Sequence, residues 1–338
     1  MKKVTLILAL MVGSVTFAQE TEAPKSTPLE ITGSGDLYYK YDFSKNANIP
    51  TSFGSDQNSL SLGMLDIALK KSVGKASFVG EVSFGPRGQY QSIPNGDGVD
   101  VNSFHIQNLY ATYAFTDKFS MTAGYMGTFV GYEVISPVAN FHYSTSYLFT
   151  YGPFQNAGVK ANYKISDKFG AMVGVFNDTW NTYKADPTKG LSTIGAQLSY
   201  AADGVSAYLN FMDGSVSGTI IDLTATFQLS EKFKLGLNAA DFSNTGDAGY
   251  SGLALYPSYA ISDTFALGLR GEYFDFKDGS NGGSSVTAFT LSANLKAGGF
   301  TFIPEFRLDS NSDEVFVNSD MDPTKSASQV VLAVVYGF

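Results

Sequence analysis

Charged residues recur two positions apart within alternating stretches of this chain. Arg270 and Glu272 form one such pair, and Glu305 and Arg307 form another. Residues two apart in a β-strand point to the same face, so each pair would present both charges on one surface. Such groups could hold ions or charged solutes, or they could simply pair in water, where an ion pair contributes little. Nine charges share this parity and are predicted to line a polar interior: Lys160, Lys164, Asp222, Lys234, Arg270, Glu272, Lys296, Glu305 and Arg307.

Groups suited to covalent or acid–base catalysis are scarce. The histidines are His105 and His142, and neither has a serine or carboxylate at a recognisable spacing. His105 falls on the outward parity of its run. The chain has no cysteine, which excludes disulfides and thiolate metal ligands. No phosphate-binding glycine loop or zinc spacing occurs. We therefore expect a protein that is not an enzyme and that uses no cofactor or metal ion.

One stretch, residues 128–155, is rich in Phe and Tyr. It contains a single acid, Glu133, and no Lys or Arg. A solvated external loop is rarely so aromatic. We predict that this segment folds into the interior and narrows it, and the alternative is a loop packed on its neighbours at the rim. The candidate constriction residues are Tyr132, Glu133, Tyr143, Tyr147 and Phe149.

The elements that would position these residues are strands joined by turns. A pattern of apolar residue, hydroxyl, acid, polar residue and Phe recurs at 115–119, 165–169, 229–233 and 261–265. Three more short connections are predicted at 72–75, 202–204 and 297–299. Eight longer segments lie between them, namely 44–57, 86–102, 128–155, 177–190, 213–219, 243–249, 275–285 and 309–327. These connections predict sixteen strands, with fourteen or eighteen as alternatives because boundaries read from sequence are uncertain.

Alternation of apolar and polar residues along these runs predicts an all-β fold. Short connections alternating with long ones are typical of a transmembrane antiparallel β-barrel with short periplasmic turns and long extracellular loops. The apolar set changes parity near residues 63–64, which predicts a β-bulge there. Pro257 falls on the lipid-facing parity, where it removes a ladder donor without an evident reason. A soluble exported β-sandwich or propeller is the alternative fold.

Both ends of the chain resemble export signals. Residues 1–18 combine Lys2 and Lys3 with an apolar stretch and a small residue at Ala18, which predicts a signal peptide cleaved near Ala18. Residues 19–28 are predicted to be a periplasmic linker, and 29–338 the barrel. The chain ends on Val334, Tyr336 and Phe338 in alternation, which resembles the signal that engages the outer-membrane insertion machinery. We therefore expect an integral protein of the bacterial outer membrane.

The central segment also carries a family resemblance. Residues 131–137, Asn140, residues 143–149, residues 153–154 and Gly158 resemble the signature of the β-barrel porin-2 (OmpL-like) family of Gram-negative bacteria. Residues 58–62, 74–76 and 84–86 are similar to the second hairpin of that family. The resemblance implies an outer-membrane barrel with a channel role, and it supplies no catalytic or substrate residues.

Composition limits the partners. The formal net charge is −9, and loss of the leader would also remove Lys2 and Lys3, which makes the mature chain more negative. Nucleic acid is therefore not an expected partner. We expect outer-membrane lipids, lipopolysaccharide, the insertion machinery and small hydrophilic solutes, and a homotrimer stays open. The expected function is a porin-like channel for passive diffusion of small hydrophilic solutes. A non-conducting barrel acting as an anchor, adhesin or assembly partner is the alternative.

Overall fold

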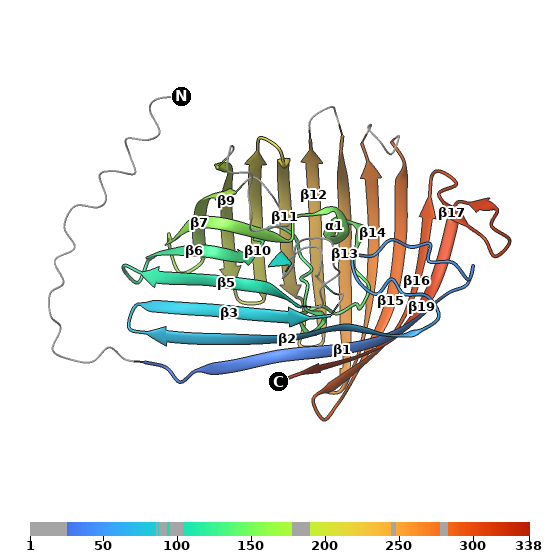
Figure 1. Cartoon of the computed structure of the whole chain (residues 1–338), viewed down its shortest axis with the longest axis horizontal. Coiled ribbons are helices and arrows are strands. Elements are labelled where there is room, and N and C mark those ends of the chain that lie inside the picture. The colour runs from blue at the N-terminus through green and yellow to red at the C-terminus, as the bar shows by residue number, and fades with distance from the viewer. Residues whose placement is uncertain are drawn as a thin grey trace.

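The protein is a closed antiparallel barrel of sixteen long strands in which the first strand pairs with the last. The computed structural model describes residues 26–85, 87, 93–94, 104–177, 190–244, 248–277 and 283–338. The barrel strands are β1 (Glu30–Asp42), β2 (Leu60–Val73), β3 (Ala76–Phe84), β5 (Phe104–Ala114), β6 (Phe119–Gly127), β7 (Gln155–Lys164), β8 (Phe169–Asn177), β9 (Leu191–Ala202), β10 (Val205–Gly214), β11 (Gly218–Gln228), β12 (Phe233–Ser243), β13 (Gly249–Ser262), β14 (Phe265–Phe276), β15 (Ser285–Ala297), β16 (Phe300–Asn311) and β19 (Ser326–Gly337). The predicted fold class and strand number are confirmed (Figure 1).

Shorter elements complete the described chain. The two-residue strand β4 (Ile93–Pro94) pairs with β5, while β17 (Phe316–Val317) and β18 (Pro323–Thr324) form a separate hairpin. A 3-10 turn, η3 (Pro137–Ala139), and a short helix, α1 (Tyr147–Tyr151), lie between β6 and β7. Among the described residues, no helix is long and apolar enough to cross a bilayer.

Several predicted segments fall outside the described residues. They are the signal peptide 1–18, most of the linker 19–28, and parts of the long connections 86–102, 177–190, 243–249 and 275–285. The described end of the linker lies beside the turn between β2 and β3. There the N–H of Thr27 donates a hydrogen bond to Ser72 O at 3.0 Å.

Alternation along each strand separates a lipid-type face from a polar interior. In β14 the outward side chains of Leu267 and Leu269 are about two-fifths exposed, whereas the inward Arg270 and Glu272 are buried. Apolar side chains outside and polar ones inside are what a barrel in a bilayer requires, because lipid solvates the outer face.

The repeated turn pattern has a local explanation. In three of its copies the hydroxyl accepts a hydrogen bond from the N–H of the Phe three residues later, at 3.0 to 3.1 Å: Thr116 from Phe119, Ser166 from Phe169, and Ser230 from Phe233. Ser and Thr favour turns because their hydroxyls can replace a backbone acceptor in this way. The fourth copy differs, since β13 continues to Ser262 and its register shifts between Ala260 and Ser262.

Two bulges set which side chains face inward. The predicted bulge at Gly63–Met64 is confirmed, because the register with β1 shifts between Gly35 and Leu37. A second shift, between Glu81 and Val82 of β3, leaves Gln107 of β5 as the extra residue. This bulge reverses the parity of His105, which was predicted to point outward and is instead buried inside the barrel, so that prediction was wrong.

Pro257 interrupts the regular pairing of neighbouring strands. The pairing of β12 with β13 is continuous, whereas the pairing between β13 and β14 skips residues 256–257. The backbone donor that Pro257 lacks is therefore missing on the β14 side.

The connection predicted at 213–219 is shorter than expected. The strands extend into it to Gly214 and Gly218, where the positive φ of Gly218 (82°) permits a tight turn.

Candidate functional site

Residues 128–154, here called the lumen loop, fold inside the barrel. The loop contains η3 and α1, and α1 contacts β12, β13 and β14 (Figure 1). Its Tyr143, Tyr147 and Phe149 are almost fully buried. The structure thus places the candidate constriction residues within the ring of strands.

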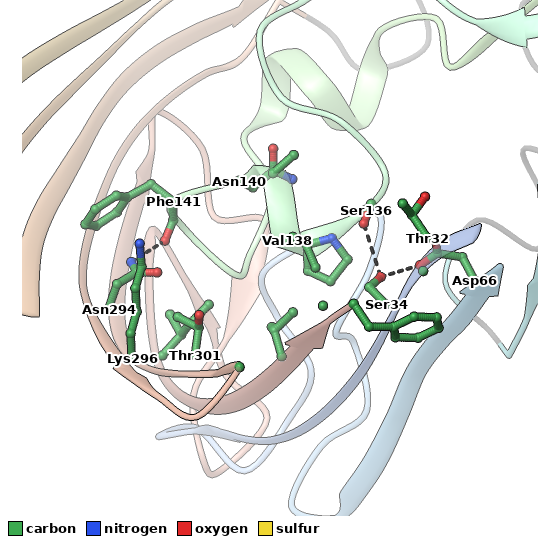
Figure 2. A pocket seen from close by; sticks show the side chains of 18 of the residues that line it. Thr32, Ser34, Asp66, Ser136, Val138, Asn140, Phe141, Asn294, Lys296 and Thr301 are labelled. Atoms are coloured by element: carbon green, nitrogen blue, oxygen red, sulfur yellow. Dashed lines mark hydrogen bonds between the residues drawn. The ribbon is translucent and has the colours of Figure 1, made fainter. Parts of the chain in front are cut away.

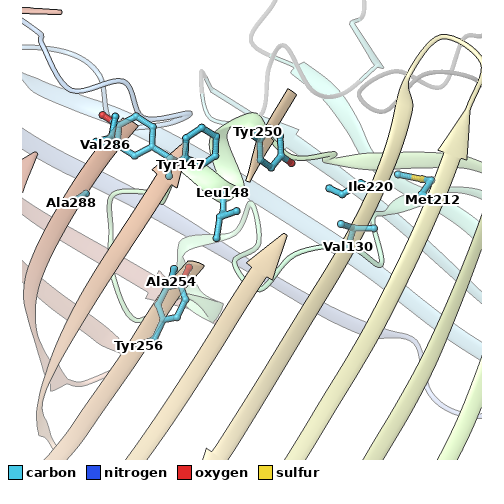
Figure 3. Packing of buried hydrophobic residues seen from close by; sticks show 11 residues of the cluster. Val130, Tyr147, Leu148, Met212, Ile220, Tyr250, Ala254, Tyr256, Val286 and Ala288 are labelled. Carbon is cyan, nitrogen blue, oxygen red and sulfur yellow. The ribbon is translucent and has the colours of Figure 1, made fainter. Parts of the chain in front are cut away.

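An apolar core forms between the lumen loop and the inner wall. Val130, Tyr147 and Leu148 of the loop pack against wall residues of β10 to β15 (Figure 3). The wall members of this cluster are Met212, Ile220, Tyr250, Ala254, Tyr256, Phe274, Val286 and Ala288. Burial of this surface stabilises the loop in its inward position.

Wall glycines leave recesses for the large side chains of the loop. A Cβ atom built on any of four wall glycines would collide with a loop side chain, so only glycine admits the present packing. The pairs of wall glycine and loop residue are Gly195 and Phe129, Gly236 and Tyr132, Gly268 and Phe141, and Gly252 and Leu148.

Two wall carboxylates hold the backbone of the loop. Glu305 accepts hydrogen bonds from the N–H groups of Tyr143 (2.8 Å) and Ser144 (3.1 Å). Glu272 accepts from the N–H groups of Tyr147 and Leu148, each at 2.9 Å. A carboxylate shared by two successive N–H groups is a strong, charge-assisted contact, and here it satisfies donors that would otherwise be buried without partners.

Two wall arginines bind the same stretch from the donor side. Arg270 donates to Glu133 Oε1 at 2.7 Å and to Ser144 O at 2.6 Å. Glu133 also accepts from the N–H of Ser146 at 2.7 Å. Arg307 donates to Thr145 O at 2.7 Å and makes a bidentate pair with Asp309 at 2.8 and 2.9 Å.

Polar contacts also hold the start and the middle of the loop. Near its start, Asp222 Oδ1 accepts from Gly131 N at 3.0 Å. Further along, Tyr143 Oη donates to Asp36 Oδ2 at 2.6 Å, and Arg87 pairs with the same oxygen at 3.5 Å. The Arg87 guanidinium also lies 4.8 Å from the centre of the Tyr143 ring.

The nine charges predicted to line the interior therefore divide into two sets. Five lie on the inner face but are buried beneath the loop, namely Asp222, Arg270, Glu272, Glu305 and Arg307. The four lysines Lys160, Lys164, Lys234 and Lys296 are half-buried or exposed on the inner face. Lys164 pairs with Asp167, which lies in the turn between β7 and β8, at 2.7 Å. This hydrogen bond lowers the pKa of the Asp167 carboxyl.

A cavity of about 730 Å³ lies at the short-turn end, below the loop (Figure 2). Lys234, Lys296 and Asp66 are its charged lining side chains within the described chain, and Ser34 donates a hydrogen bond to Asp66. Asn294 Nδ2 donates to Phe141 O at 2.9 Å at its edge. This cavity is a water-accessible space that the loop does not fill.

Two residues of the predicted insertion signal, Val334 and Tyr336, lie on the closing strand β19, and Phe338 directly follows it. Tyr336 and Phe338 are exposed, and the Tyr336 ring lies 4.8 Å from that of Phe300. Val334 pairs with Leu37 of β1 and Phe302 of β16. Their role as a signal stays a prediction.

His142 has the neighbours that the sequence did not reveal. Its Nδ1 lies 2.7 Å from Ser292 Oγ, which donates to Glu305 Oε2 at 2.8 Å. The serine stands between the histidine and the acid, whereas a nucleophilic triad needs the histidine in the middle. All three side chains are buried, so this arrangement is a structural contact of the loop.

Sequence reasoning missed three residues of this network: Arg87, Ser292 and Asp309. Asp309 continues the inward series of Glu305 and Arg307, so the spacing could have revealed it. Nothing in the sequence relates Ser292 to His142, because 150 positions separate them.

A closed barrel of sixteen strands with polar side chains inside and a loop folded into it is the architecture of an outer-membrane porin. The family model described as Putative beta-barrel porin-2, OmpL-like matches residues 28–338, so the chain belongs to that family. A comparison with curated proteins finds no significant relative.

Solved porins share the fold at low sequence identity. The outer-membrane channel DcaP of Acinetobacter baumannii superposes with a TM-score of 0.61 at 15% identity, covering 95% of this chain and 99% of that one. An anion-selective porin from Comamonas acidovorans gives 0.64 at 14% identity, covering 93% and 100%. OmpF of Salmonella typhi, in complex with daunomycin, gives 0.63 at 10%, covering 92% and 97%. Family and fold indicate an outer-membrane channel rather than an enzyme.

Proposed function

We propose that the protein is a channel for passive diffusion of small hydrophilic solutes, with the lumen loop as its constriction. The observation that carries this proposal is the pair of wall carboxylates, Glu272 and Glu305, each of which holds two successive N–H groups of the loop. A loop fixed in this way reduces the cross-section permanently. The cavity at the short-turn end supports an incompletely filled lumen.

Planar-bilayer recording of the refolded protein tests this function. We expect discrete conductance steps from the wild type and larger steps after deletion of residues 134–150, because the deletion removes the central part of the loop. Equal conductance of the two proteins would reject the constriction role. A wild type without any steps would reject the channel itself.

The second candidate is a non-conducting barrel that serves as an anchor, adhesin or assembly partner. It is favoured by the packing of the loops at the long-loop end. Phe53 of the first external loop packs against Phe149 and Phe154 of the lumen loop, with ring centres 5.8 and 6.2 Å apart. Asn48 and Val317 are also joined by two hydrogen bonds, at 2.8 and 2.9 Å. The recording described above separates the two candidates.

Further proposals concern export and partners. We propose cleavage near Ala18, a periplasmic linker at 19–28, and Val334, Tyr336 and Phe338 as the signal for the insertion machinery. Outer-membrane lipids and lipopolysaccharide would surround the barrel, and a homotrimer is a further proposal. The mass of the mature protein tests cleavage near Ala18. The amount of the Phe338→Ala variant that is recovered in the outer membrane tests the insertion signal.

A further inference from the structure

A second space in the lumen differs chemically from the cavity at the short-turn end. It measures about 280 Å³ and lies between the start of the lumen loop and the wall formed by β9, β10 and β11. Every residue that lines it is uncharged. The main groups are the rings of Phe129, Tyr132 and Tyr208, the amide of Gln197, and the hydroxyls of Ser206 and Thr226.

The aromatic rings are held in fixed positions. Phe129 occupies the recess at Gly195 and packs on the buried Phe176, with ring centres 5.8 Å apart. Tyr132 occupies the recess at Gly236 and stacks on Tyr256, with centres 4.5 Å apart and planes 24° apart. Rings fixed in this way lose little entropy when a solute binds against them.

The polar groups are also positioned by neighbours. Gln197 Nε2 donates to Asn210 Oδ1 at 2.8 Å and to Phe129 O at 3.3 Å, which orients its amide. Asp222, a buried acid of β11, accepts hydrogen bonds from Gly131, Asn210 and Asn238. Its carboxylate is not among the lining groups, so the cavity offers hydroxyls and an amide but no ionic partner.

We propose that this cavity is a subsite for a neutral polyhydroxylated solute, such as a mono- or disaccharide. Aromatic rings cover the apolar C–H faces of such a solute, while amide and hydroxyl groups exchange hydrogen bonds with its own hydroxyls. A charged solute would lose water here without gaining a counter-charge. The inference rests on the proposed channel function, and it names the class of solute that the channel would retain briefly during passage.

The test uses the full refolded protein in planar bilayers with maltose as the probe. A poly(ethylene glycol) of similar hydrodynamic size serves as a solute that fills space but lacks hydroxyl donors along its length. We expect maltose to reduce the KCl current saturably and at lower concentration than the polymer. Equal effects of maltose and polymer would overturn the proposal.

Variants of Tyr208, the aromatic residue that the wall contributes to the cavity, make this test more specific. Tyr208→Ala removes a partly exposed ring that belongs to the wall rather than the loop, and it should raise the half-blocking maltose concentration about two- to tenfold. Tyr208→Phe should keep most of the effect. The control is Tyr110→Ala, which removes a half-buried inward ring of β5 that does not line the cavity. An unchanged half-blocking concentration in Tyr208→Ala would contradict the subsite.

Saturation-transfer NMR of maltose with the detergent-solubilised protein measures binding without any current. If the wild type carries no current but binds maltose through Tyr208, the channel proposal fails and the subsite stands. If it conducts and binds no maltose, the subsite alone fails.

Discussion

Single residues of the inner wall show how a barrel holds a loop inside itself. Arg270, Glu272, Glu305 and Arg307 are buried, and each of them binds at least one group of the lumen loop. Each charge has several hydrogen bonds, which is the condition under which a buried charge is tolerated. Removing one member leaves its partner buried without compensation, and this costs more than the pair contributes.

We expect Arg270→Met to destabilise the protein by about 3–5 kcal/mol, because Glu133 would remain buried without its cation. Urea unfolding of the refolded protein in lipid vesicles measures this. Lys296→Met, at an exposed inward position, is the matched control and should change stability by less than about 0.5 kcal/mol. A loss below about 1 kcal/mol for Arg270→Met would show that the ion pair does not hold the loop.

The exposed inward lysines make a separate prediction. Replacing both Lys234 and Lys296 by Glu reverses two charges that line the cavity at the short-turn end, so the permeability ratio should move toward cations. The reversal potential across a KCl gradient measures this shift. Lys232→Glu, in a turn outside that cavity, should leave the reversal potential nearly unchanged. A shift toward anions in the double variant would contradict the assignment.

At the level of elements, the strands were predictable and the contacts between loop and wall were not. Alternation and the turn pattern are local, so they revealed sixteen strands and the bulge at Gly63–Met64. The bulge at Gln107 has no such signal, and the parity of His105 was wrong for that reason. The inward position of the aromatic segment followed from its composition. Its partners on β14 and β16 are more than 100 residues away and share no pattern with it.

The glycine recesses allow a test of the loop as an element. Gly268→Val should expel the Phe141 ring toward the cavity at the short-turn end and so reduce the single-channel conductance. Gly271→Val is the matched control, because its side chain would point outward and make ordinary contact with Phe289 at 3.6 Å. If both variants conducted like the wild type, the recess would not position the loop.

In the whole molecule, buried apolar clusters lie inside the ring of strands, between the lumen loop and β10 to β15 and between the loop and β1, β16 and β19. The outer face carries exposed apolar side chains, and the ring closes through the pairing of β1 with β19. Closure pairs both edges of each of the sixteen barrel strands in the described part of the chain, as a bilayer requires.

Closure can be tested directly because the chain has no cysteine. Tyr39 and Leu332 are direct partners across β1 and β19, so Tyr39→Cys with Leu332→Cys should form a disulfide on mild oxidation. The pair Leu37→Cys and Val330→Cys is offset along the same two strands and should not. Intact mass and mobility without reductant distinguish the outcomes. Cross-linking of the offset pair alone would mean a different register.

The wall binds Ser144, Thr145, Tyr147 and Leu148 through their main-chain atoms. Hydrogen bonds to main-chain atoms can form whichever side chains those positions carry. In the channel proposed above, relatives could therefore exchange the side chains of this stretch, and acquire a different filter, while inheriting the same main-chain anchorage.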